Sequence, residues 1–273
     1  MATSSNPAFT NSPAFSARAS KAAQLVRPAS PELTAQQLTE LYQRPSATPA
    51  DTDRMSYEDT ILKIAASFII LLGGAAVGWF LPALLLPAML VGFVLALVNI
   101  FKKKPSPALV VAYAAVEGVF VGGISSFFAA RWDGIVVQAV FGTLAVVAIT
   151  LLLFASGKVR ASKKATQVFL VAMLGYLAFS LVNFGLMAFG VTTSMFGLRD
   201  TMIFGIPLGA ILGVFIIIMA AYSLVLDFTS IKVGVERGAP RVYGWTAAFG
   251  IMVTVVWLYL EMLRLIAILR GSN

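Results

Sequence analysis

The chain of 273 residues contains neither cysteine nor histidine. Without cysteine, disulfides, thiolate metal sites, iron–sulfur clusters and cysteine nucleophiles are excluded. Without histidine, Ser-His-Asp catalysis, zincin motifs and the most common proton carrier near neutral pH are excluded. The remaining site chemistry belongs to carboxylates, lysine, arginine, tyrosine, hydroxyls and amides. We therefore expect no cofactor, and any bound metal should be a hard cation such as calcium or magnesium.

Charged residues are also scarce. They make up 12% of the chain, and 59% of the residues are hydrophobic, whereas an ordinary soluble domain is about a quarter charged and about half apolar. A typical water-soluble enzyme is therefore excluded. The net charge of +8 would suggest nucleic acid in a soluble protein, but here lysine and arginine gather between apolar runs, where an anionic membrane surface attracts them. We expect a lipid bilayer, and not nucleic acid, as the partner.

Residues 1–55 differ in composition from the rest of the chain. They are rich in Ala, Ser, Thr, Pro and Gln, and such a segment buries too little apolar surface to offset its conformational entropy. We predict a disordered cytoplasmic N-terminal tail. The stretch 31–42 has two interpretations. It is either an amphipathic helix that lies on the membrane surface or docks to a partner, or a transient helix within this tail.

The second domain, residues 56–273, contains seven apolar stretches. Each approaches the roughly 20 residues that a membrane-spanning helix needs. Ser56 followed by Asp59 is typical of a capped helix start, Pro107 suits the first turn of a helix, and Gly238-Ala239-Pro240 breaks the chain before the seventh stretch. The sequence predicts an all-α polytopic membrane protein with helices at 61–80, 83–101, 108–129, 134–155, 166–190, 203–227 and 245–269.

The loop charges predict the orientation of these helices. Basic residues lie at 102–104, at 158–164 and at 232–241, whereas the alternate loops contain only Arg131 and Arg199, each close to an acid. Because basic loops stay in the cytoplasm, we expect the N-terminus in the cytoplasm and the C-terminus outside.

Three acidic residues fall inside the predicted helices: Glu117 in the third, Asp227 in the sixth and Glu261 in the seventh. A charge at the bilayer centre costs about 3 kcal/mol on insertion scales, so such a residue is protonated, paired or facing a wet cavity. Glu117 either makes one interhelical hydrogen bond or contributes to a pore or its gating. The neighbouring stripe of Gly118, Gly122 and Ser125 predicts the close approach of another helix.

Asp227 and Glu261 are the best candidates for a site. Arg264 lies one turn beyond Glu261, so Glu261 either is neutralised by it or pairs with Asp227. The sixth helix should continue to about Arg237, and pairing then requires tilt or an irregular helix start to absorb a mismatch of roughly 9 Å. Two such carboxylates would share one proton, and losing it would drive the helices apart and offer oxygen ligands to calcium.

Several motifs carry a family resemblance. The run Leu226-Asp-Phe-Thr-Ser-Ile-Lys, the later Tyr259-Leu-Glu and the pair Glu117-Gly118 resemble the Bax inhibitor 1 family, also called the transmembrane Bax inhibitor motif family. The Asn-Pro-x-Phe start of the tail and the run Ala-Arg-Trp-x-Gly-Ile-Val-Val are similar to a bacterial branch of it.

The resemblance implies a seven-helix fold in which two groups of three helices surround a central C-terminal helix. It also implies a pH-dependent calcium leak. Its paired acid sensor would be Asp227 and Glu261, both also candidate calcium ligands, with Glu117 as the early-helix acid and Arg264 as a gating candidate.

Three classes of function follow from this interpretation. The first is a pH-sensitive calcium or cation leak in the bacterial plasma (inner) membrane. The second is a regulator without transport, which binds a membrane protease or another partner protein. The third, an intramembrane aspartyl protease, needs a Gly-x-Gly-Asp motif, and neither Asp227 nor Glu261 follows one. We therefore expect no enzyme.

Overall fold

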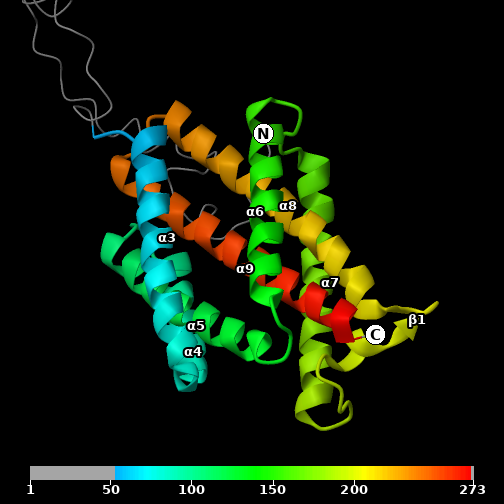
Figure 1. Cartoon of the computed structure of the whole chain (residues 1–273). Helices are drawn as coiled ribbons and strands as arrows, with labels where there is room; N and C mark the ends of the chain where they lie inside the picture. The colour runs from blue at the N-terminus through cyan, green and yellow to red at the C-terminus, as the bar shows by residue number, and fades with distance from the viewer. Residues whose placement is uncertain (1–52, 272–273) are drawn as a thin grey trace, which may run out of the picture.

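A computed structural model describes residues 53–271, which contain seven helices long and apolar enough to cross a membrane (Figure 1). The predicted all-α polytopic fold is confirmed. The predicted tail, except for residues 53–55, and the candidate helix at 31–42 lie outside the described residues. The helices are α3 (Tyr57–Phe80), α4 (Leu85–Phe101), α5 (Pro107–Ala129), α6 (Ile135–Ala155), α7 (Lys163–Ala188), α8 (Leu208–Glu236) and α9 (Gly244–Gly271), with short 3-10 turns η1 (Pro82–Leu84), η2 (Gly197–Asp200) and η3 (Arg241–Tyr243).

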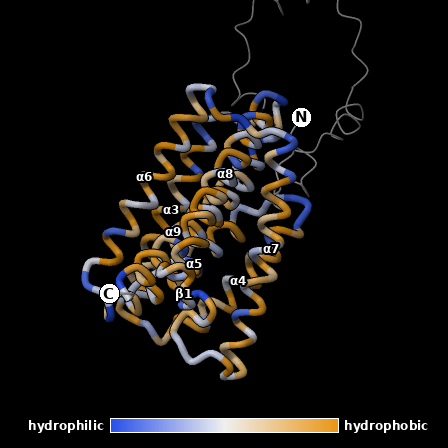
Figure 2. The backbone as a smooth tube through the Cα atoms, turned by 90° about the vertical axis from the view of Figure 1, so that its right-hand side faces the viewer, coloured by the Kyte–Doolittle hydropathy of each residue, from blue (hydrophilic) through white to orange (hydrophobic). Residues whose placement is uncertain are grey.

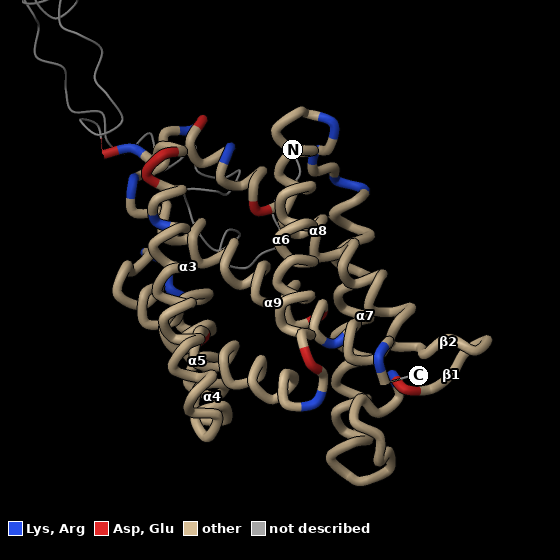
Figure 3. The backbone as a smooth tube through the Cα atoms, in the orientation of Figure 1, with Lys and Arg blue, Asp and Glu red and all other residues tan. Residues whose placement is uncertain are grey.

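The last helix, α9, is the most extensively buried of the seven. Figure 1 shows α3, α4 and α5 on one side of it and α6, α7 and α8 on the other. Apolar residues cover most of the helical surface (Figure 2), and lysine and arginine gather where α3 begins, where α6 leads into α7 and where α8 turns into α9 (Figure 3). The arrangement of two three-helix groups around a central helix is therefore confirmed.

The predicted helix ends have clear local causes. Ser56 caps α3, because its Oγ accepts a hydrogen bond from the backbone N–H of Asp59 at 3.2 Å. Pro107 is the first residue of α5, where its missing N–H leaves no hydrogen bond unmade. After α8, Gly238 adopts a φ of +63°, which reverses the chain toward α9.

The α3 and α5 helices touch backbone to backbone. A Cβ atom added at Gly118 would lie 2.1 Å from the carbonyl oxygen of Leu71, and one at Gly122 would lie 1.9 Å from that of Ala75. Only glycine permits this approach. The predicted small-residue stripe on the third span is confirmed, and its partner is α3.

The chain before α3 is tied to the turn before α9. The Met55 N–H donates to the Ala239 carbonyl at 2.7 Å, and the Arg241 N–H donates to the Asp53 carbonyl at 2.8 Å. Asp59 reinforces the junction by accepting hydrogen bonds from Arg241 Nε at 2.9 Å and Nη2 at 2.7 Å. This junction fixes the start of α9 against the start of α3.

The predicted start of the sixth helix at 203 is wrong. The strands β1 (Met202–Ile203) and β2 (Ile206–Pro207) form an antiparallel hairpin, and α8 begins only at Leu208. The cause is the two-residue turn at Phe204 and Gly205, with φ of +52° and +79°, followed by a proline that suits only the beginning of a helix. The predicted extension of this helix to about Arg237 is confirmed.

Replacing Phe204 with Asn is expected to stabilise this hairpin by about 1 kcal/mol. Phe204 is fully exposed and strained by its positive φ, whereas Asn before Gly is the preferred pair for a turn with two positive φ angles. Amide hydrogen exchange at 202–206 should slow by about fivefold. Faster exchange in the variant would contradict this account of the turn.

Candidate functional site

The most polar site inside the helix bundle surrounds Glu261 on α9. Only 2% of this residue is exposed. Its Oε1 accepts a hydrogen bond from Arg264 Nη1 at 2.5 Å and another from the hydroxyl of Tyr176 on α7. Its Oε2 lies 3.7 Å from Nη1 of Arg199, which belongs to η2 in the α7–α8 connection. We call these four residues the Glu261 cluster.

Tyr176 joins all members of the Glu261 cluster. Its hydroxyl donates to Glu261 and accepts from Arg199 Nη2 at 2.8 Å and from Arg264 Nη1 at 3.2 Å. The hydroxyl therefore uses its one hydrogen and both lone pairs. This single oxygen connects α7, α9 and the α7–α8 connection.

Arg199 is held in place by α7. Asn183 accepts a hydrogen bond from the Leu198 N–H at 2.7 Å and donates to the Phe196 carbonyl at 3.2 Å. The guanidinium of Arg199 lies 5.3 Å from the ring centroid of Tyr176 and 5.7 Å from that of Phe179. Hydrogen bonds thus position the backbone, and two aromatic rings flank the buried charge.

The charges of the Glu261 cluster do not balance. One carboxylate faces two guanidinium groups, and arginine keeps its charge in proteins, so the formal charge is +1 with Glu261 ionised. Among residues 53–271, Arg199 Nη1 and Glu261 Oε2 find no hydrogen-bond partner, although they form an ion pair. A proton on Glu261 would raise the formal charge to +2.

Asp227 on α8 occupies a separate site. It is fully buried, and its Oδ2 accepts a hydrogen bond from Thr254 Oγ1 of α9 at 2.6 Å. Thr254 precedes Glu261 by seven residues, which is two helical turns or about 10 Å along α9. Asp227 therefore meets α9 about two helical turns before the position of Glu261.

The structure does not bring Asp227 and Glu261 together, which corrects the expected acid pair. Thr254 stands opposite Asp227, so the helical mismatch seen in the sequence is not absorbed. Two carboxylates that share a proton must be within hydrogen-bond distance, and two that share a calcium ion must each reach it at about 2.5 Å. Asp227 and Glu261 can do neither in this arrangement.

The other two candidates have different surroundings. Arg264 lies in the Glu261 cluster, as the spacing along the helix predicted. Glu117 is half-buried against α4, where its Oε2 would lie 3.0 Å from a Cβ added at Gly92. This contact lies between α4 and α5, and not at the α8–α9 interface, so a gating role for Glu117 stays a prediction.

Sequence reasoning missed Arg199, Tyr176 and Thr254. The sequence places Arg199 in a loop beside the acid Asp200, yet Asp200 accepts a hydrogen bond from the Phe196 N–H at 3.1 Å. One signal was available, because an arginine within a largely apolar connection needs a buried acid as partner. Tyr176 and Thr254 carry no signal in the sequence that separates them from other helix residues.

Comparison with known proteins gives one family. The family model described as Bax inhibitor 1 like matches residues 6–271. The match extends over nearly the whole chain and includes every residue of both sites. A comparison with curated proteins gives no match.

Proposed function

The chain belongs to the Bax inhibitor 1-like family, and from this membership we propose that it is a pH-sensitive calcium or cation leak of the bacterial inner membrane. The observation that carries the proposal is Glu261, buried between guanidinium groups from α9 and from the α7–α8 connection. A single proton on this carboxylate changes how α7, α8 and α9 hold together.

In the proposed mechanism, the described arrangement is the closed state. Ionised Glu261 holds Arg199 and Arg264 near one another, and the net positive charge of the cluster repels cations. Protonation of Glu261 removes the negative charge between the two guanidinium groups. Their repulsion then moves Arg199, with the connection that carries it, away from α9.

Asp227 has a different role in this proposal. It lies two turns closer to the start of α9, which the basic loops assign to the cytoplasmic side. A carboxylate at this depth replaces part of the hydration shell of a passing cation. The expected sensor pair thus becomes one proposed sensor, Glu261, and one cation-attracting residue, Asp227.

Calcium flux into dye-loaded proteoliposomes tests the proposal. Flux through the wild-type chain should rise as the pH falls. Glu261→Gln should give high flux that no longer depends on pH, because glutamine mimics the protonated carboxylate. Asp227→Asn should lower the flux about tenfold and leave the midpoint of the pH profile unchanged, because its carboxylate lies apart from the Glu261 cluster.

Circular dichroism and size-exclusion chromatography check that the variants fold. If Glu261→Gln fails to fold because Arg199 is left buried without a counter-charge, the double variant Glu261→Gln, Arg199→Gln removes that charge as well. It should conduct without pH dependence, because neither partner of the Glu261–Arg199 ion pair remains to hold the closed state. Flux that is absent at every pH would contradict the leak and favour the regulator without transport. A pH profile that Glu261→Gln leaves intact would contradict the assigned sensor.

A further inference from the structure

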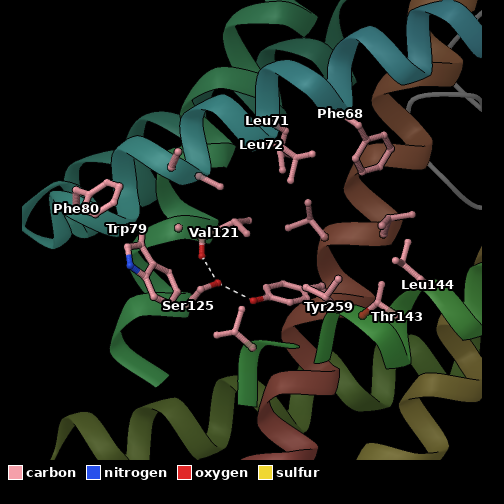
Figure 4. A pocket seen from close by; sticks show the side chains of 17 residues that line it. Phe68, Leu71, Leu72, Trp79, Phe80, Val121, Ser125, Thr143, Leu144 and Tyr259 are labelled. Atoms are coloured by element: carbon pink, nitrogen blue, oxygen red, sulfur yellow. Dashed lines mark hydrogen bonds between the residues drawn. The ribbon is translucent and has the colours of Figure 1, made fainter. Parts of the chain in front are cut away.

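A third site lies on the other side of α9 from the Glu261 cluster. α3 and α6 both pack on α9 and leave a groove of about 470 Å³ between them, with α5 and α9 as its floor (Figure 4). The rim lies on the lipid-facing surface, since Leu72 of α3 and Leu144 of α6 are 65% and 55% exposed. The groove therefore opens sideways, toward the hydrocarbon of the bilayer.

The groove has the size of a ligand pocket but no charge. Pockets for small molecules measure about 300 to 1,000 Å³. Among the described residues that line it, none is Asp, Glu, Lys or Arg. An ion or a phosphate group would be desolvated there without a partner, so the chemistry of the lining fits a neutral, largely apolar molecule.

The three hydroxyl groups of the groove have already used their hydrogens. Ser125 Oγ donates its one hydrogen to the Val121 carbonyl at 2.6 Å, so the Tyr259 hydroxyl must be the donor in the 2.6 Å bond that joins it to Ser125 (Figure 4). Thr143 Oγ1 likewise donates to the Ala139 carbonyl at 2.7 Å. The lone pairs that remain on Tyr259 and Thr143 can only accept.

We propose that this groove binds a lipid alcohol from the bilayer, a neutral molecule with one hydroxyl on a long hydrocarbon chain. The hydrocarbon chain of this alcohol lies between α3 and α6 in contact with Leu72 and Leu144, and its hydroxyl donates a hydrogen bond to Tyr259 Oη. An ordinary acyl chain fills the same space but brings no donor. The site is separate from the Glu261 cluster and does not depend on cation transport.

Trp79 provides the readout, because it lines the groove. The full chain in phospholipid vesicles is titrated with a dibrominated long-chain alcohol, which quenches tryptophan fluorescence on contact. The same titration is made with Trp79→Phe. The part of the quenching that this variant loses is assigned to Trp79. The matched probe is the methyl ether of the same alcohol, which keeps the chain and oxygen but lacks the donor. The alcohol should quench at about fivefold lower concentration, the value of one buried hydrogen bond.

Two variants test the donor in opposite ways. Tyr259→Phe should lower the affinity for the alcohol to that for the ether and leave the affinity for the ether unchanged. Ser125→Ala frees the hydrogen of Tyr259 to bond the ether oxygen, so the ether should gain affinity and the difference between the probes should shrink. Tyr222→Phe, which removes a hydroxyl bonded to Thr166 outside the groove, is the control and should change neither probe.

Each outcome decides the proposal. Equal quenching by alcohol and ether in the wild-type chain would mean that the groove takes any hydrocarbon chain, and would overturn it. A preference for the alcohol that survives in Tyr259→Phe would also overturn it, because the hydroxyl would then be recognised elsewhere. If Tyr259→Phe does not fold, Ser125→Ala still separates the two results.

Discussion

Replacing Gly74 with Ala should lower the free energy of unfolding by about 3 kcal/mol, the upper range for overpacking a tight contact. A Cβ atom at this residue of α3 would lie 2.3 Å from the Ala115 carbonyl oxygen and 3.1 Å from the Val119 nitrogen of α5. Both are backbone atoms and cannot rotate away. The hydrogen bonds within each helix keep it rigid, so neither backbone can bend locally around the added methyl group. The two helices would therefore have to separate along their length.

The neighbouring Gly73 provides a matched control. It lies on the same helix, and a Cβ atom added there meets nothing within 4 Å. Gly73→Ala should leave the stability unchanged or raise it by up to about 1 kcal/mol, because alanine is the better helix former. Unfolding of both variants in mixed micelles, followed by circular dichroism, makes the comparison. Similar losses in the two variants would contradict backbone contact as the basis of the α3–α5 interface.

Replacing Arg199 with Gln should raise cation flux at neutral pH by about tenfold. The variant removes one of two positive charges from the Glu261 cluster, and the remaining Arg264 and Glu261 form a neutral pair. Two unit charges 4 Å apart interact by about 4 kcal/mol at an effective dielectric constant of 20. Lowering the barrier to cation passage by a third of that energy already raises the rate of passage about tenfold.

Arg131→Gln is the control for Arg199→Gln. Both arginines belong to connections on the same predicted side of the membrane. Arg131 is exposed, however, and within residues 53–271 it donates only to the Phe127 carbonyl, at 3.1 Å. Its replacement should leave flux unchanged. Flux that stays at the wild-type level in Arg199→Gln would show that this guanidinium neither repels the cation nor holds the closed state.

The features predictable from the sequence are those that neighbouring residues determine. Seven helices follow from apolar runs of sufficient length, because lipid forces each backbone segment to satisfy its own hydrogen bonds. The capping of α3 by Ser56 and the bend at Gly238 depend on residues within one turn. The stripe of Gly118 and Gly122 indicated close helix packing because it marks one face of one helix, although it did not indicate which helix would pack there.

The candidate site was harder to predict from the sequence, because its contacts join residues that are far apart in the chain. Glu261 meets Tyr176 across 85 positions of sequence, and Asp227 meets Thr254 across 27. Helical periodicity gives the face on which a residue lies, but the depth at which two helices align depends on the length and shape of their connection. Here η3 and the turn at Gly238 set the alignment of α8 and α9, and they place Thr254 opposite Asp227.

The central position of α9 has a consequence for biosynthesis. Membrane helices leave the ribosome in order, so the six helices that pack around α9 enter the bilayer before the helix that joins their two groups. Until α9 is inserted, Asp227 lacks the hydroxyl of Thr254, and Arg199 lacks the carboxylate of Glu261. The nascent chain therefore carries Asp227 and Arg199 without these contacts from α9, and a ribosome stalled before residue 244 would leave an incomplete helix bundle to the quality-control proteases of the membrane.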